Sequence, residues 1–194
     1  MGERATGSYD FENEINGCAF IYDVNTKLCA DFMLPDALTT TLYGIWHNGG
    51  SSYTLAGGYS TAEFGEISQA FLVDYDAATK ATSNLKSFSY NNETILSIVT
   101  HFEGITVADD NGYHMPADWI NVKGSPKEGA SFVSVKRNQE GSFAEAKWID
   151  IAYPGDMVTS ANTAYKNNIL GICVADNGSG TPVTSSFCAT VTTI

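Results

Sequence analysis

The chain of 194 residues carries 22 acidic and only 10 basic residues, which gives a formal net charge of −12. Nucleic acids and anionic membrane surfaces both select for clustered Lys and Arg, so this charge argues against either as a partner. The length and a hydrophobic content of 43% suit one domain, residues 1–194, with a single sizeable core.

Residues that favour strands are abundant, with 10 Tyr and 10 Phe, whereas the strong helix formers Leu, Lys, Arg and Glu are sparse. Side chains alternate with period two, as in residues 20–23 and 71–75, and no segment shows a convincing helical period with caps. This pattern predicts an all-β fold of about 14 antiparallel strands with little or no helix.

A short strand-like segment recurs along the chain. It reads AFIYD at 19–23, AFLVD at 70–74, SFVSV at 131–135 and FCATV at 187–191. Periods of about 50 to 60 residues are typical of supersecondary units that bury their apolar faces by stacking on one another.

The recurrence predicts three and a half β units. Their approximate bounds are 4–51, 52–111, 112–167 and, for the half-unit, 168–194. We expect the C-terminal half-unit to pair with N-terminal strands, which would close the chain into a barrel-like or few-bladed propeller-like domain.

Turn signals separate the expected strands. Segments rich in Asn, Asp and Gly occur at 47–51, 109–112, 138–141 and 176–180. Because Gly, Asn and Asp accept positive φ, these four segments are predicted to be hairpin turns.

The recurring unit resembles the bacterial HAF-type extracellular repeat. The segments that carry the resemblance are Ala19–Asp23, Phe32–Pro35, Leu42–Ile45 and Gly58–Tyr59, in that order. The resemblance implies a β repeat, propeller-like or barrel-like, and implies no activity. The chain departs from the pattern at Trp46–His47, and it carries His101 and Glu103 ahead of the second Gly-Ile pair.

These departures suggest a site on the inner strands. Aligning Gly44, Gly104 and Thr163 places corresponding residues of three strands in rings, because side chains at i and i+2 share a strand face. The polar ring residues are Tyr43, His101, Glu103, Ser160 and Asn162, beside an apolar floor of Ile45, Ile105 and Ala164 with His47 one step beyond.

His101 and Glu103 are the predicted catalytic pair. An imidazole and a carboxylate on one strand face can act as general acid and base. Substrate-binding roles are predicted for Tyr43, His47, Ser160, Asn162, Ile45 and Ile105. The alternative is a solvated His and Glu on the outward face of an antiparallel strand.

Other residue types predict less. The sequence has no phosphate loop, no dinucleotide fingerprint and no closely spaced Cys or His ligands, so we expect no cofactor and no metal. The tryptophans at 46, 119 and 148 are interpreted as core or rim packing rather than a sugar platform.

Cysteines 18, 29, 173 and 188 fit either two hairpin-flanking disulfides or reduced thiols. No apolar leader is visible at the N-terminus. The sequence fits a cytoplasmic protein or one secreted after processing, and it fits either a monomer or an oligomer.

Two functions fit these observations. The first is a cofactor-independent isomerase or lyase that applies acid–base chemistry to a small apolar oxygenated molecule, for example a terpene-type epoxide, in a closed β interior. The second is a non-catalytic ligand-binding, lectin-like or adhesion module that uses loops near His47–Gly49, Asp109–Asn111 and Asn167–Asn168. The units differ most at the ring positions, which favours the enzyme.

Overall fold

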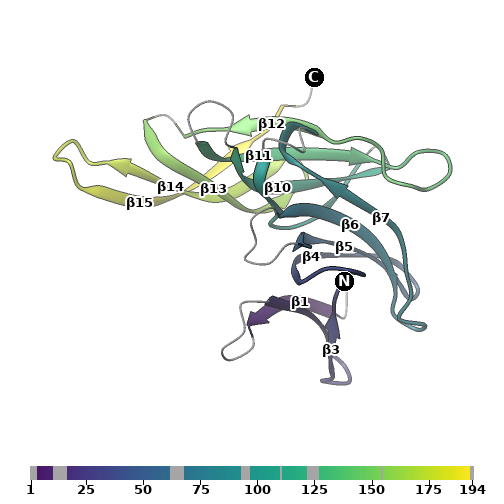
Figure 1. Ribbon diagram of the computed structural model, residues 1–194. Helices are drawn as coiled ribbons and strands as arrows, with labels where there is room; N and C mark the ends of the chain where they lie inside the picture. Colours follow the sequence, from purple (N-terminus) through teal and green to yellow (C-terminus); the bar gives the residue numbers. More distant parts are fainter. Residues whose placement is uncertain are drawn as a thin grey trace.

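The computed structural model describes seven ranges of the chain: 4–10, 17–61, 68–92, 97–109, 111–121, 127–153 and 155–192. Within them the chain forms 15 strands, and its only helical element is a single 3-10 turn at Tyr90–Asn92. The all-β prediction is therefore confirmed (Figure 1). None of the helical structure in these ranges is long and apolar enough to span a bilayer.

The strands form four antiparallel sheets. Sheet 1 contains β1 (Arg4–Asp10), β2 (Gly17–Asp23) and β3 (Cys29–Phe32). Sheet 2 contains β4 (Thr39–Gly49), β5 (Ser52–Ser60), β6 (Gln69–Asp76) and β7 (Thr82–Phe88). Sheet 3 contains β8 (Ser97–Phe102), β9 (Thr106–Ala108), β10 (Gly112–Asn121), β11 (Lys127–Lys136) and β12 (Lys147–Ile151). Sheet 4 contains β13 (Asp156–Tyr165), β14 (Asn168–Asp176) and β15 (Pro182–Thr190).

Short hairpins explain why each sheet is a simple meander. Positive φ angles occur in all four segments predicted to turn, at Gly49, Gly50, Asn111, Gly141, Gly178 and Gly180. The segment 138–141 is a turn closed by the Asn138 carbonyl, which accepts the Gly141 N–H. The turns near residues 51, 111 and 167 join neighbouring strands of one sheet. Sheets 2, 3 and 4 therefore begin one or two strands before the corresponding sequence units.

The recurring segments occupy β2, β6, β11 and β15. In sheets 1 to 3 this strand is interior, and its buried residues contribute to the cores between sheets. Phe71 and Phe132, at the second position of the segment, are completely buried. Burial of these aromatic side chains accounts for the strong sequence signal at those positions.

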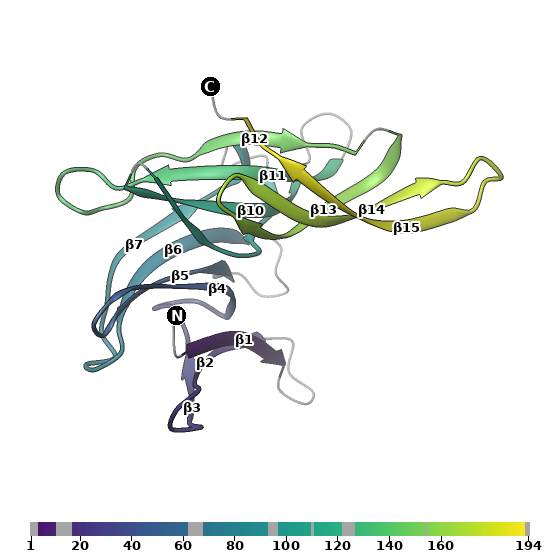
Figure 2. The same cartoon turned by 180° about the vertical axis from the view of Figure 1, so that it is seen from behind.

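Successive sheets pack face to face. Strand β4 lies across β1 and β2, β8 lies across β5 and β6, and β13 lies across β10 and β11. One apolar cluster fills each of these three junctions. We call β4, β8 with β9, and β13 the inner strands. Figures 1 and 2 show the resulting succession, with sheet 1 at one end and sheets 3 and 4 at the other.

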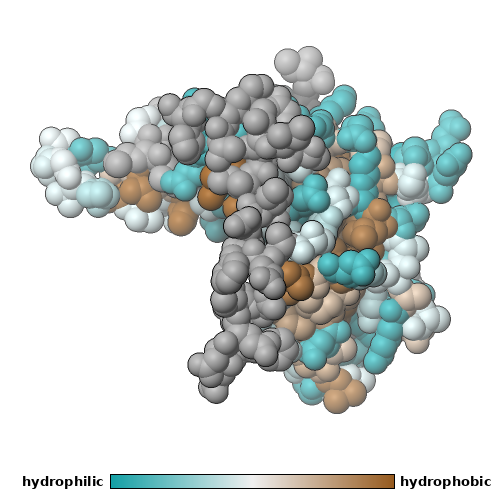
Figure 3. Space-filling view, in the orientation of Figure 1, coloured by the Kyte–Doolittle hydropathy of each residue, from teal (hydrophilic) through white to brown (hydrophobic). Residues whose placement is uncertain are grey.

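Closure is not confirmed. Among the described strands β1 pairs only with β2 and β15 only with β14, so the predicted pairing of the C-terminal half-unit with N-terminal strands is not found. Sheet 4 exposes Leu170, Ile172 and Val183. Apolar colour is visible on the arm formed by β14 and β15 in Figure 3.

The inner strands approach each other through a glycine. A Cβ atom on Gly44 would lie 2.8 Å from the carbonyl carbon of Gly104 and 2.9 Å from the backbone nitrogen of Ile105. Gly104 lies in turn beside Thr163 of β13, where an added Cβ would be 3.7 Å from the Thr163 Cα. The three positions aligned in the sequence are therefore neighbours in space.

Gly44→Ala tests this contact, with Gly104→Ala as the matched control. The new methyl at 44 meets backbone atoms that must shift, so we expect a loss of about 1–3 kcal/mol in unfolding free energy. A methyl at 104 meets no atom closer than 3.6 Å, so this variant should change stability by less than about 1 kcal/mol. Denaturant unfolding measures both. Equal effects of the two substitutions would contradict the close approach.

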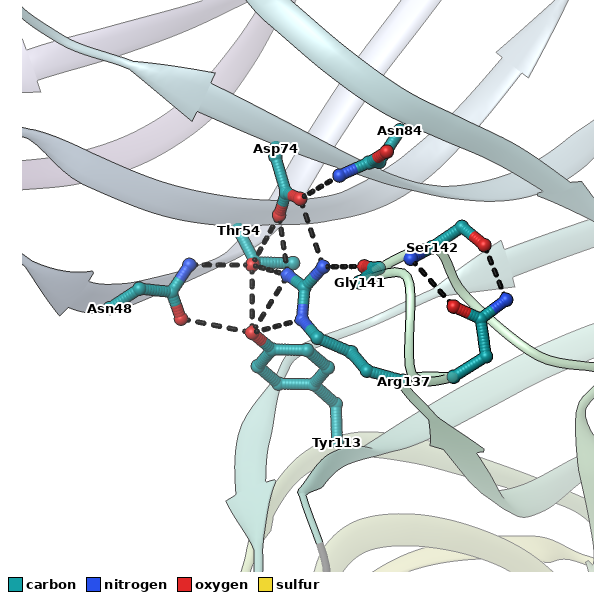
Figure 4. A network of polar contacts seen from close by, with 9 residues as sticks. Asn48, Thr54, Asp74, Asn84, Tyr113, Arg137, Gly141 and Ser142 are labelled. Atoms are coloured by element: carbon teal, nitrogen blue, oxygen red, sulfur yellow. Dashed lines mark hydrogen bonds and ion pairs between the residues drawn. The ribbon is translucent and has the colours of Figure 1, made fainter.

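A partly buried ion pair joins sheets 2 and 3 (Figure 4). The Arg137 guanidinium donates to both carboxylate oxygens of Asp74, at 2.5 and 2.9 Å, and each side chain is only 16% exposed. Burial alone would raise the pKa of Asp74, but hydrogen bonds from Arg137 and Asn84 outweigh it and hold the pKa below its usual range. The carboxylate is therefore charged at neutral pH, and the pair is complete.

Removing Arg137 leaves the Asp74 charge without its cation. We expect Arg137→Ala to cost about 3 kcal/mol or more of unfolding free energy. Lys86→Ala, which breaks an ion pair with the largely exposed Glu145, should cost no more than about 1 kcal/mol. Thermal and urea unfolding give both values. A similar small cost for the two variants would show that the buried pair does not stabilise the junction.

Candidate functional site

His101 and Glu103 lie at the innermost edge of sheet 3, where sheets 2, 3 and 4 meet. The His101 Nδ1 and Glu103 Oε1 atoms are 3.9 Å apart, and the side chains are 28% and 18% exposed. A solvated pair on an outward strand face would be far more exposed. The site is therefore partly enclosed by protein.

Sheet 2 fixes the orientation of the imidazole. The His101 Nε2 atom is 2.9 Å from the Ser68 Oγ, and the Tyr43 ring centroid lies 6.2 Å from that of His101. Gly58 makes room for the ring, because a Cβ at this position would lie 2.3 Å from the His101 Cδ2. With Nε2 engaged by Ser68, the other ring nitrogen faces Glu103.

Asp118 connects the pair to sheet 4. It lies directly opposite His101 in the register between β8 and β10, so the two side chains share a face. Its carboxylate accepts hydrogen bonds from the Ser160 hydroxyl at 2.5 Å and from the Ala161 N–H at 2.8 Å. We call Ser68, His101, Glu103, Asp118 and Ser160 the inner cluster.

Two carboxyl groups in the inner cluster resist ionisation. Burial, and next to it the charge of Asp118, raise the pKa of Glu103 to about 7. Burial also raises the pKa of Asp118, although the bonds from Ala161 and Ser160 oppose this effect. Burial lowers the pKa of His101. Near neutral pH, Glu103 is thus poised between acid and carboxylate beside a neutral imidazole.

A pocket of about 200 Å³ opens beside His101. Its walls are rich in hydroxyl groups, and its lining comprises Thr39, Thr41, Gly58, Tyr59, Ser60, Ser68, Val99 and His101. Glu103 is not part of this lining and lies toward the other ring nitrogen. In place of the predicted closed interior, His101 reaches a half-open pocket whose lining carries hydroxyl groups but exposes mostly apolar surface.

Strand irregularities explain how the aligned residues are presented. The pairing of β4 with β5 shifts between Leu42 and Gly44, and that of β13 with β14 shifts between Ala161 and Thr163. Tyr43 and Asn162 are the extra residues of these bulges. The register of β10 with β8 likewise differs by one residue from that with β9, on either side of Glu103. Bulges re-aim side chains and are common beside functional sites.

The structure brings together only part of the predicted site. His101 and Glu103 are neighbours, Tyr43 lies beside His101, and Ser160 joins through Asp118. Asn162 is exposed at its bulge, away from these contacts.

The predicted apolar floor does not line the pocket, because Ile45 and Ile105 pack against the cores between sheets. His47 is exposed, its Nε2 is 3.0 Å from the Gly50 carbonyl oxygen, and it lines a different pocket.

Sequence reasoning missed Asp118 and Ser68. A carboxylate within the largely apolar segment 115–120 was the available signal for Asp118. Ser68 had none, since its contact with His101 joins residues 33 positions apart.

All four cysteines are free thiols. Within the described ranges, no three His, Cys, Asp or Glu side chains could share a metal ion.

The chain matches no known family model, and no functionally characterised protein is significantly similar to it. The resemblance to HAF-type repeats therefore stays a prediction.

Glu103→Gln tests the carboxyl environment through stability. Because the folded pKa lies above the unfolded value of about 4.5, the wild type loses stability as pH rises from about 4.5 to about 7. Gln removes this loss, so the variant should gain about 2–3 kcal/mol relative to wild type between pH 5 and pH 8. Glu140→Gln, at an exposed turn, is the control and should show no such gain. A pH-independent difference for Glu103→Gln would refute the shifted pKa.

Proposed function

We propose that the inner cluster performs general acid–base catalysis on a small oxygenated molecule bound beside His101. The observation that carries this proposal is the chain of contacts from Ser68 through the imidazole to Glu103, at the edge of a pocket. His101 faces the pocket and is the catalytic residue. Glu103 acts through it, as a positioning residue that holds or releases a proton.

The reaction class that suits this arrangement is isomerisation or lysis without a cofactor. For an epoxide, proton delivery to the ring oxygen breaks one C–O bond, and loss of a proton from the neighbouring carbon gives an allylic alcohol with no net change in atoms. One group that gives a proton and one that takes a proton suffice. The imidazole and a carboxyl group whose pKa is about 7 supply both at neutral pH.

The substrate is expected to be small. A pocket of about 200 Å³ lies below the usual range for drug-sized ligands. Hydroxyl groups on its walls would orient an ether, epoxide or alcohol oxygen toward the imidazole. Closure of the recurring β units into a barrel-like or few-bladed propeller-like domain belongs to the same proposal.

Turnover of a panel of small epoxides, including cyclohexene oxide and a terpene-type epoxide, tests the function. We expect His101→Ala and Glu103→Gln to reduce the rate constant by about 100-fold or more, the usual contribution of general acid–base catalysis. For wild type, the rate should fall as pH rises through about 7, because Glu103 then loses its proton. Glu103→Gln should abolish this pH dependence, and Glu140→Gln should retain it.

Two results would contradict the assignment. One is a panel in which wild type neither converts nor binds any member, measured by product analysis and by ligand-observed NMR. The other is turnover that folded His101→Ala and Glu103→Gln proteins retain in full.

A further inference from the structure

A second pocket, of about 250 Å³, lies at the junction of sheets 2 and 3 and shares no residue with the first. It is lined by Trp46, His47 and Asn48 from the end of β4, by Val107, Asn111, Gly112 and Tyr113 around the turn between β9 and β10, and by Arg137. Two loops that are distant in sequence, near residues 48 and 111, therefore form one site. The acid–base proposal does not use it.

One side of this pocket is fixed by hydrogen bonds. The Tyr113 hydroxyl donates to the Asn48 Oδ1 at 2.9 Å, and the Asn48 Nδ2 donates to the Thr54 Oγ1 at 2.8 Å. Figure 4 shows Asn48, Tyr113 and Arg137 converging around this hydroxyl. These bonds use one of the two amide donors of Asn48 and one lone pair of its oxygen. The amide is thus held in place with capacity to bind a further polar group.

The charge in the pocket is already neutralised. Arg137 directs its donors to Asp74, Thr54, Tyr113 and the Gly141 carbonyl, with distances from 2.5 to 3.4 Å. All three guanidinium nitrogens therefore bond protein groups, and the paired carboxylate cancels the charge. An anionic ligand would find no unpaired cation among the residues that line this pocket. The chemistry selects an uncharged polar molecule.

The lining of this pocket also includes aromatic and apolar side chains. Trp46 is partly buried against the core between sheets 2 and 3, and Val107 is 42% exposed. The exposed His47 ring rests against Tyr53, with centroids 4.9 Å apart. Aromatic and apolar side chains that share a pocket with the fixed Asn48 amide match a sugar ring, which has an apolar C–H face and a rim of hydroxyl groups.

We infer that this pocket binds one uncharged sugar ring of a carbohydrate. Trp46 and Val107 contact the apolar face of the sugar, whereas Asn48, Asn111 and His47 bond its hydroxyl groups. All three tryptophans pack in or against the core as the sequence predicted, and Trp46 also lines this pocket. Carbohydrate binding here is independent of any reaction at His101.

Titration with neutral sugars, followed by tryptophan fluorescence and ligand-observed NMR, tests the inference. The probes are glucose, galactose, mannose, fucose and N-acetylglucosamine, then a glycan array. We expect saturable binding of at least one neutral sugar with a change in Trp46 emission that Trp46→Phe removes. His47→Ala and Asn111→Gly, which keeps the positive φ of 60° at 111, should weaken affinity by about 10-fold each.

His101→Ala, in the first pocket, is the matched control and should leave sugar affinity unchanged. The inference is overturned if no neutral sugar binds up to high millimolar concentration and none on the array is retained. It is equally overturned if folded His47→Ala and Asn111→Gly variants bind as wild type does, or if only anionic sugars such as glucuronic acid bind. None of these results affects the epoxide assay, so failure of one proposal is distinguishable from failure of the other.

Discussion

The close contact of Gly44 with the backbone at Gly104 is the constraint on which the functional geometry depends. Inner strands that carried side chains at this point would be held apart by at least the thickness of a methyl group. Because the backbones touch, β4 lies close enough to β8 for Tyr43 to reach His101. On the far side of Gly104, β13 brings Ser160 to Asp118. The inner cluster is thus a product of how sheets stack rather than of any one strand.

Farther from the inner cluster, an arginine that contacts both an aspartate and a tyrosine occurs at two junctions between sheets. Within sheet 1, Arg4 of β1 pairs with Asp23 of β2 at 2.8 Å, and its guanidinium reaches sheet 2, where it lies 5.3 Å from the centroid of the Tyr53 ring. Between sheets 2 and 3, Arg137 pairs with Asp74 and lies 5.3 Å from the Tyr113 ring. Both aspartates end the recurring strand segment, and both tyrosines are the second residue of their strand. The same three residue types thus reinforce both junctions, through the cation–π contact between sheets 1 and 2 and through the ion pair between sheets 2 and 3.

Much of the fold was predictable from the sequence, because alternation and turn chemistry act locally. Positive φ at Asn111 and Gly178 follows from residue type, and burial of Phe71 follows from its place in an alternating strand. The boundaries between sheets were harder to predict, because the expected boundaries of the sequence units fall at hairpin turns that join neighbouring strands of one sheet. Strand closure was an expectation about long-range pairing, which local pattern does not determine.

The candidate site was predictable only where partners lie on one strand. His101 and Glu103 are two residues apart, so strand geometry alone brings them together. Asp118 enters through cross-strand register and Ser68 through packing between sheets, and neither relation is visible in sequence spacing. Arg4 and Arg137 occupy unrelated positions in their sequence units. Comparison of the units therefore could not reveal that each pairs with the aspartate at the end of a recurring segment. The bulge at Asn162 turned a predicted inward residue outward.

Direct titration of the Glu103 carboxyl group tests most sharply whether the stacked sheets create the inner cluster. Carbon-detected NMR of labelled protein, assigned with Glu103→Gln, should show a carboxyl resonance that titrates with a pKa of about 7. In Asp118→Asn the same resonance should titrate at a lower pH, because one neighbouring negative charge is gone. A carboxyl pKa near the ordinary value of about 4.5 in wild type, unchanged by Asp118→Asn, would contradict the account.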